Sequence, residues 1–213
     1  MAQIYAYRHS EQWGVAKFKT MFDRLTYQDQ VEVMKYKRWQ DRESHLIGRL
    51  LWVLALEKRE YLHAKQIVLS EFGRPVWPLA NGDANLSHSG EWVLLAITDR
   101  GFIGIDIEKK VSQNIDEFKS GFSRIEWEMI TTSKGEILED FYTLWTQKEA
   151  VLKAEGRGWS NKPDAITWKD NTGYIGVSTY SLVPIAVSGD YACHIAVNMP
   201  VPVSVKYTVI QKL

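Results

Sequence analysis

The sequence contains a single cysteine, Cys193, and has no net charge, no long apolar run and no low-complexity segment. One cysteine excludes an internal disulfide and a metal site built from cysteines. Because 26 basic and 26 acidic residues cancel, nothing indicates a protein that wraps a nucleic acid or another polyanion. No apolar stretch is as long as the about 18 residues that a membrane-spanning helix needs, and residues 1–7 lack the pattern of a targeting signal. We therefore expect a cytoplasmic protein that binds neither nucleic acid nor membrane.

The pattern of apolar residues predicts an α+β protein, and 213 residues suffice for one large domain or two small ones. Residues 41–62 are expected to form a long helix whose apolar face comprises Leu46, Ile47, Leu50, Leu51 and Leu54. Residues 123–132 and 139–154 also predict helices, and residues 166–213 predict strands with Pro and Gly at their turns. Within that tail Cys193 lies in an alternating strand, where we expect a small buried residue.

Two apolar runs near the middle of the chain predict a β-hairpin. Residues 93–98 and 102–108 have the composition of strands. Asp99, Arg100 and Gly101 between them are typical of a tight turn. The two strands are therefore expected to pair with each other.

The second of these strands places two carboxylates on one face. With a period of two residues its three isoleucines face a core, whereas Asp106 and Glu108 face the opposite, open side. Glu149 and Lys153, four residues apart on a predicted helix, share one helical face. Each pair alone is also typical of a solvated strand or of a helix-surface ion pair. Together, three carboxylates and a lysine can hold a magnesium ion against a pyrophosphate.

Five motifs carry a resemblance to a known family. They are GRP (residues 73–75), NLSHSG (85–90), GIDIE (104–108), FSRIE (122–126) and WTQKEAVLK (145–153). Their order, spacing and wording resemble those of the 4′-phosphopantetheinyl transferases of the Sfp type, over roughly residues 36–158. The chain differs from many family members in having Arg74 in place of a lysine.

The resemblance implies a holo-[acyl-carrier-protein] synthase, which moves 4′-phosphopantetheine from coenzyme A to a serine of an apo carrier protein and releases 3′,5′-ADP. It also implies an α+β fold of two pseudo-related α/β subdomains, with coenzyme A in the cleft between them. We place the boundary near Gly101, so that residues 1–101 bind the coenzyme and residues 102–213 carry the magnesium ion and the catalytic residues. The implied partners are coenzyme A and an acyl, polyketide or peptidyl carrier protein, and we expect a monomer.

The resemblance assigns roles to the charged residues. Asp106, Glu108 and Glu149 are expected to bind Mg²⁺ together with the pyrophosphate, and Lys153 is expected to offset charge on the phosphate under attack. The candidate base for the serine hydroxyl is Glu149 or a water held by the metal and a carboxylate, and the sequence leaves both open. The coenzyme is expected to contact Lys153 and also Arg42, Arg49, Arg74, Pro75, Ser87 and His88.

The coenzyme-binding residues also have simpler interpretations. Arg42 and Arg49 lie seven residues apart on one helical stripe, and such basic runs are commonly solvated helix faces. As ligands of the 3′-phosphate they would act together with Arg74, because arginine binds phosphate in a bidentate way. Ser87 and His88 are likewise typical of residues that hydrogen-bond within a turn.

The carrier surface and the overall activity have alternatives too. Trp127, with Arg124 and Lys134, is a candidate for meeting the acidic helix of a carrier, but it is equally typical of a core tryptophan. Glu126 at a helix start is typical of helix-dipole chemistry and is not assigned to the metal. The alternatives to a transferase are a catalytically inactive coenzyme-A-binding or assembly subunit and a metal-dependent nucleotide pyrophosphohydrolase.

Overall fold

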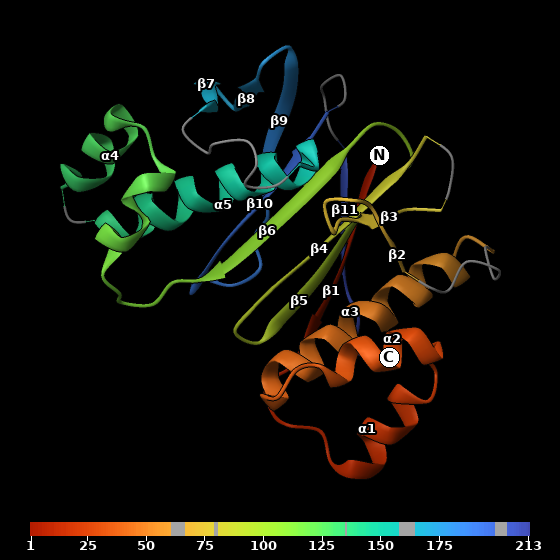
Figure 1. The fold of residues 1–213 in the computed structure, drawn as a ribbon. Helices are drawn as coiled ribbons and strands as arrows, with labels where there is room; N and C mark the ends of the chain where they lie inside the picture. Colours follow the sequence, from red (N-terminus) through yellow and green to blue (C-terminus); the bar gives the residue numbers. More distant parts are fainter. Residues whose placement is uncertain (61–66, 79–80, 135, 158–164, 199–203) are drawn as a thin grey trace.

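The computed structural model describes residues 1–60, 67–78, 81–134, 136–157, 165–198 and 204–213 (Figure 1). One sheet has the strand order β11-β1-β5-β4, and a second has the order β6-β10-β9-β8-β7. The strands of the first sheet are β1 (Ala2–Arg8), β4 (Asp83–Ser89), β5 (Trp92–Thr98) and β11 (Val205–Val209). Those of the second are β6 (Ile103–Lys109), β7 (Thr167–Lys169), β8 (Thr172–Ile175), β9 (Ser178–Pro184) and β10 (Tyr191–Val197). A short ribbon comprises β2 (Val68–Leu69) and β3 (Pro75–Val76).

The helices combine with these sheets in one chain and confirm the α+β class. They are α1 (Val15–Phe22), α2 (Tyr27–Met34), α3 (Trp39–Glu57), the 3-10 helix η1 (Ile115–Gly121), α4 (Arg124–Thr131) and α5 (Ile137–Glu155). Helix α3 covers the first sheet, where Leu46 and Leu50 share an apolar core with Leu95 and Ile97 of β5. The helix predicted over residues 41–62 is thus α3, and residues 61 and 62 of that range lie outside the described residues.

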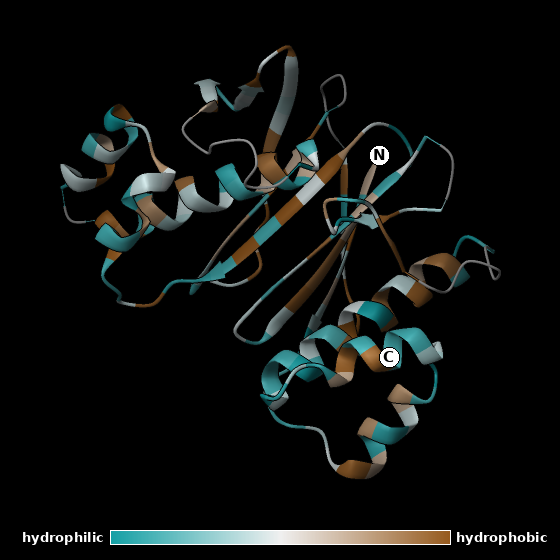
Figure 2. Cartoon of the chain, in the orientation of Figure 1, coloured by the Kyte–Doolittle hydropathy of each residue, from teal (hydrophilic) through white to brown (hydrophobic). Residues whose placement is uncertain are grey.

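Helix α5 lies against the second sheet, and a glycine allows its close approach. A Cβ atom at Gly104 of β6 would overlap the backbone of α5 at Ala150 and Ala154. Apolar and polar residues alternate along β6 (Figure 2). Its three isoleucines are buried in a core shared by both sheets, as predicted, and Asp106 and Glu108 lie on the side that faces α5.

The predicted hairpin between residues 93–98 and 102–108 is wrong. Strand β5 pairs with β1 on one side and with β4 on the other, so neither of its edges is free. Strand β6 instead pairs antiparallel with β10 in the second sheet. Gly101, with a φ of 68°, lies where the chain passes from one sheet to the other.

Side chains of β4 take the place of a backbone ladder between the two sheets. Alternate residues of β4 accept hydrogen bonds from backbone N–H groups of alternate residues of β6, and we call this contact the seam. Its four bonds run from Ile103 to Asp83 Oδ2 (2.7 Å), Ile105 to Asn85 Oδ1 (3.0 Å), Ile107 to Ser87 Oγ (3.3 Å) and Lys109 to Ser89 Oγ (3.0 Å). The seam satisfies the edge of β6 that β10 leaves open. It also fixes the NLSHSG segment beside the GIDIE strand.

The division into residues 1–101 and 102–213 stays a prediction. The chain changes sheets at this point, but β11 returns to the first sheet and pairs in parallel with β1. Helices α4 and α5 and the strands after residue 166 lie where the sequence predicts them. Cys193 is buried in β10, as expected, and burial raises the pKa of its thiol. None of the described helices is long and apolar enough to cross a membrane.

Candidate active site

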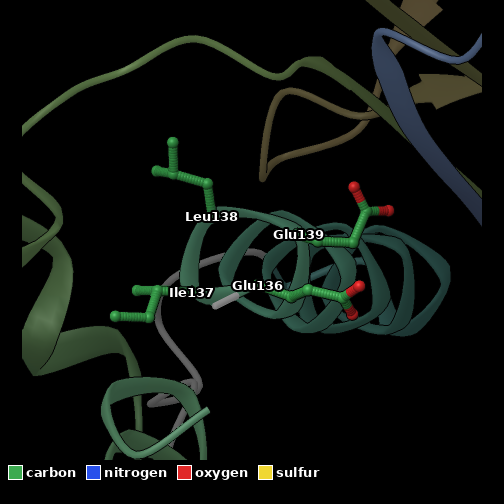
Figure 3. Close-up of a pocket in the computed structure, with 4 residues that line it drawn as sticks. All are labelled: Glu136, Ile137, Leu138 and Glu139. Carbon is green, nitrogen blue, oxygen red and sulfur yellow. The ribbon is translucent and has the colours of Figure 1, made fainter. Parts of the chain in front are cut away.

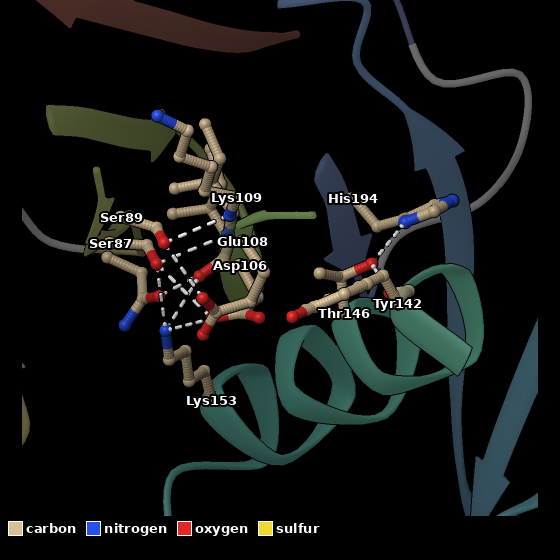
Figure 4. A network of polar contacts seen from close by, with 12 residues as sticks. Ser87, Ser89, Asp106, Glu108, Lys109, Tyr142, Thr146, Lys153 and His194 are labelled. Carbon is tan, nitrogen blue, oxygen red and sulfur yellow. Dashed lines mark hydrogen bonds and ion pairs between the residues drawn. The ribbon is translucent and has the colours of Figure 1, made fainter. Parts of the chain in front are cut away.

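Lys153 of α5 reaches the carboxylate of Asp106 on β6 (Figure 4). Its Nζ atom lies 2.6 Å from Asp106 Oδ1, 3.1 Å from Ser87 Oγ and 3.2 Å from the carbonyl oxygen of Ile105. Burial opposes the charge of Lys153, but the neighbouring carboxylates, Asp106 first, outweigh burial and raise the pKa of the lysine. Asp106 is buried, so the prediction that it lies on an open face is wrong: α5 and its lysine cover that face.

The other two carboxylates lie close enough to Asp106 to feel its charge. Glu108 accepts a hydrogen bond from Ser89 Oγ at 2.8 Å. Burial, and then repulsion from Asp106, raise the pKa of Glu108 to about 7. The same two causes in the same order raise the pKa of Glu149 to about 7. A site in which two carboxyl groups resist ionisation in this way would be stabilised by an added positive charge.

The donor set fits a hard divalent cation, which prefers carboxylate oxygens. Oδ2 of Asp106 is buried and has no hydrogen-bond partner within the described residues. In that same part of the chain, no three histidine, cysteine, aspartate or glutamate side chains are gathered closely enough to form a metal centre. The three carboxylates therefore suit a divalent cation by their chemistry and their charge, although they are not gathered into a metal centre. In this structure the cation that Asp106 contacts is Lys153.

A pocket of about 330 Å³ lies beside these groups, with walls from α3 and β4. Three rings meet in its wall: Tyr36 stacks on His45 with centroids 3.8 Å apart, and His88 lies edge-on to His45 at 5.5 Å. Burial, then the neighbouring His88, lower the pKa of His45 to about 4. Desolvation, then Lys153, also lower the pKa of His88, so both rings are mainly neutral at pH 7. Tyr36 and His45 were not predicted as site residues, because neither belongs to one of the five motifs.

A smaller pocket of about 210 Å³ adjoins the first. The two share Gly73, Pro75 and Asn85 in their linings, and Lys153 lines the smaller one. The predicted residues Pro75, Ser87 and His88 are thus brought together with Lys153 around one connected hollow.

Two of the three predicted arginines lie on α3 but differ in where they point. Arg49 lines the larger pocket and pairs with Asp29 at 3.0 Å. The guanidinium carbon of Arg42 instead lies 5.6 Å from the ring centroid of Phe18, outside the linings of both pockets. Of the pair, the structure brings Arg49 alone to the pocket.

Arg74 lines the smaller pocket, but other groups already bind its guanidinium. It donates hydrogen bonds to the Asp83 carboxylate and to the carbonyl oxygens of Ile103 (2.8 Å) and Ala154 (3.1 Å). These acceptors belong to β4, β6 and α5, so the arginine ties together the three elements that frame the site.

A buried ion pair that was not predicted lies behind the site. Nζ of Lys148 lies 2.7 Å from both carboxylate oxygens of Glu126. The Trp168 indole and the backbone N–H of Ser123 donate to the same carboxylate, each at 2.6 Å. Glu126 therefore caps α4 and holds it against α5, and its oxygens are occupied by these donors. The one indication in the sequence was the position of Lys148, which directly precedes Glu149 in the WTQKEAVLK motif.

A further pocket, of about 490 Å³, lies at the start of α5 and is lined by Glu136, Ile137, Leu138 and Glu139 (Figure 3). Among the described residues, its lining contains two acidic and two apolar side chains and no basic one. It is therefore unsuited to a phosphate-bearing ligand, and the connected hollow beside Lys153 remains the candidate site.

Two family models match the chain in succession. A model described as 4′-phosphopantetheinyl transferase, N-terminal, matches residues 12–100. A second, described as 4′-phosphopantetheinyl transferase superfamily, matches residues 102–195. The chain belongs to the 4′-phosphopantetheinyl transferase superfamily. The two matches adjoin at residue 101, where the chain passes from the first sheet to the second.

Several curated relatives carry the same family name. The 4′-phosphopantetheinyl transferase Sfp of Bacillus subtilis is 35% identical over 132 residues, which are 60% of this chain and 58% of that protein. The 4′-phosphopantetheinyl transferase psf-1 of Bacillus pumilus is 27% identical over 176 residues, 75% of each chain. The 4′-phosphopantetheinyl transferase AcpT of Salmonella typhimurium is 33% identical over 121 residues, 54% of this chain and 59% of AcpT. The match thus spans less than two thirds of Sfp and of AcpT.

Proposed function

We propose that this chain transfers the 4′-phosphopantetheine group of coenzyme A to a serine of an apo carrier protein. The observation that carries the proposal is the gathering of Lys153 and three mutually repelling carboxylates beside a pocket large enough for part of a nucleotide. Membership of the superfamily supports it. We further propose that the chain acts in the cytoplasm as a monomer.

In the proposed reaction the serine oxygen of the carrier attacks the β-phosphorus of the coenzyme's pyrophosphate. A P–O bond to the serine forms, the bond from that phosphorus to the bridging oxygen breaks, and 3′,5′-ADP leaves. The serine proton passes to Glu149 or to a water held by a carboxylate. Lys153 offsets the negative charge on the phosphate under attack.

We propose that Asp106, Glu108 and Glu149 would hold Mg²⁺. When bound, the ion would neutralise both the pyrophosphate and the carboxylate cluster. The unpartnered Oδ2 of Asp106 and the raised pKa values of the two glutamates support this assignment.

For the coenzyme, we propose that its nucleotide end occupies the larger pocket. Ser87 and His88 line this pocket, where the neutral His88 can donate a hydrogen bond to a phosphate or ribose oxygen and Arg49 supplies a guanidinium. The pantetheine phosphate would then lie toward Pro75 and Lys153 in the smaller pocket.

We propose that the carrier docks on α4. Trp127 is only 8% exposed and packs on Phe122, which confirms its interpretation as a core residue and removes it from this surface. Ile125 and Met129, four residues apart on the same helix, are 65% and 68% exposed. With the exposed Arg124, which pairs with the exposed Glu128, they give α4 an apolar surface beside one arginine, and we propose that this surface meets an acidic helix of the carrier.

The test is a loading assay on separate apo acyl, polyketide and peptidyl carriers, with coenzyme A and Mg²⁺, read by intact-protein mass spectrometry. We expect at least one carrier to gain the mass of a single phosphopantetheine, and Asp106→Asn to prevent the gain. Free phosphopantetheine without a loaded carrier would instead show a pyrophosphohydrolase. Saturable coenzyme A binding with no product on any carrier would show an inactive coenzyme-binding subunit.

A further inference from the structure

Two serines of β4 face two carboxylates of β6 in the same relative position (Figure 4). Ser87 lies next to Asp106, nineteen residues later in the chain, and Ser89 lies next to Glu108, also nineteen residues later. The repeat follows from the seam, because both strands advance two residues at a time with their polar faces toward each other. The two contacts therefore form one repeated arrangement.

Hydrogen counting fixes the direction of the bond at Ser89. The backbone N–H of Lys109 can only donate, so Ser89 Oγ accepts that bond at 3.0 Å. The hydroxyl has one proton, and its other partner is Glu108 Oε2 at 2.8 Å. Ser89 therefore donates to Glu108, and the backbone of β6 itself orients the donor.

Ser87 repeats this geometry at the neighbouring carboxylate. Its Oγ accepts hydrogen bonds from the Ile107 N–H at 3.3 Å and from Lys153 at 3.1 Å. Its single proton is then left for Asp106 Oδ1, at 3.2 Å. Each serine thus holds one carboxylate in a fixed orientation, although Asp106 has Lys153 as a second support and Glu108 has no such ion pair among the described contacts.

We propose that Ser89 is a positioning residue, which orients the Glu108 carboxylate to bind a divalent cation. The proposal rests on the metal site in the proposed function, and it adds a role for the second serine of NLSHSG, outside the residues expected to contact coenzyme A. A carboxylate that must rotate before it binds a metal loses affinity, and a hydrogen bond from a rigid strand prevents that rotation. Ser89 serves the seam and the carboxylate with one hydroxyl.

The test is a Mn²⁺ titration of the full-length protein, with free Mn²⁺ measured by electron paramagnetic resonance. Ser89→Ala should weaken Mn²⁺ binding by about 10- to 100-fold, the usual effect of removing a partner of a metal-binding carboxylate. Ser89→Thr keeps the hydroxyl and should bind Mn²⁺ nearly as well as wild type. Should Ser89→Ala fail to fold, Ser89→Cys replaces the hydroxyl with a weak donor of similar size and should also weaken binding.

Asn85→Ala is the matched control for the seam. It removes the equivalent bond to the Ile105 N–H but leaves the Ser89–Glu108 contact, so it should lower the melting temperature without changing Mn²⁺ affinity. Wild-type Mn²⁺ affinity in Ser89→Ala, or equal losses in Ser89→Ala and Asn85→Ala, would reduce Ser89 to a seam residue. Absence of saturable Mn²⁺ binding in wild type would also overturn the inference. Tight Mn²⁺ binding without carrier loading would refute the proposed transfer and leave the role of Ser89 intact.

Discussion

Replacing Glu149 by glutamine tests whether the carboxylate cluster is electrostatically strained in the absence of a metal. The pKa of Glu149 in the folded protein is about 7, against an ordinary value of 4.5. The folded state therefore holds this proton more tightly than the unfolded state does. Its contribution to stability is greatest below about pH 4.5 and is lost as pH rises toward 7.

The size of the effect follows from the shift. A difference of about 2.5 pKa units corresponds to about 3 kcal/mol, at 1.36 kcal/mol per unit. Glu149→Gln removes the charge with little change of shape, but the buried amide has its own desolvation cost. In EDTA at pH 8 we therefore expect the variant to be more stable than wild type by about 1–3 kcal/mol. At pH 5, where Glu149 is mainly protonated, the two proteins should be about equally stable.

The measurement is urea unfolding of both proteins in EDTA from pH 5 to pH 8. Glu128→Gln is the control, because this exposed glutamate of α4 should change stability by at most about 1 kcal/mol and by a similar amount across that range. Adding Mg²⁺ at pH 8 should stabilise wild type and have much less effect on Glu149→Gln. Parallel pH curves for wild type and Glu149→Gln would mean that the cluster is not strained, and our account of the site would fail.

Three further perturbations address other parts of the site. Asp106→Asn should lower the rate of carrier loading at least about 100-fold, since a lost magnesium ligand costs several kcal/mol. Loading near the wild-type rate would mean that Asp106 does not bind the metal. Arg74→Ala should cost about 3–5 kcal/mol in urea unfolding, because it leaves Asp83 without its ion-pair partner. In steady-state kinetics it should affect coenzyme A and dephospho-coenzyme A alike; a selective loss for coenzyme A would restore its assignment to the 3′-phosphate. Arg124→Glu should raise the Michaelis constant for the carrier and make that constant less sensitive to salt, while the constant for coenzyme A stays unchanged; an unaffected carrier constant would place docking on another face.

Local periodicity predicted much of the site. The two-residue period of β6 placed the isoleucines in a core and the carboxylates on the other face, and the four-residue spacing placed Glu149 and Lys153 on one side of α5. Both inferences needed only the geometry of a single element. The degree of burial of Asp106 was not predictable in the same way, because it depends on how closely α5 packs on Gly104.

Charged residues used inside the protein were the hardest to identify. Lys148 and Glu126 are buried together, although lysine and glutamate are residue types that usually lie on the surface. Arg74 has three acceptors from three different elements, and nothing near it in the sequence identifies them. A pattern shows what a side chain can bind, but a partner dozens of residues away decides whether it is still available to a ligand.

The false hairpin and the seam have the same physical origin. A strand needs partners for the N–H groups along both of its edges, and neither periodicity nor turn composition says where those partners come from. Asp99, Arg100 and Gly101 suit a hairpin turn, but β5 already has β1 and β4 as neighbours. The alternating polar residues of β4 have the pattern of a solvated face, and they instead bind the open edge of β6. Because the same side chains then contact Asp106 and Glu108, the choice of strand partner also sets the orientation of the candidate metal ligands.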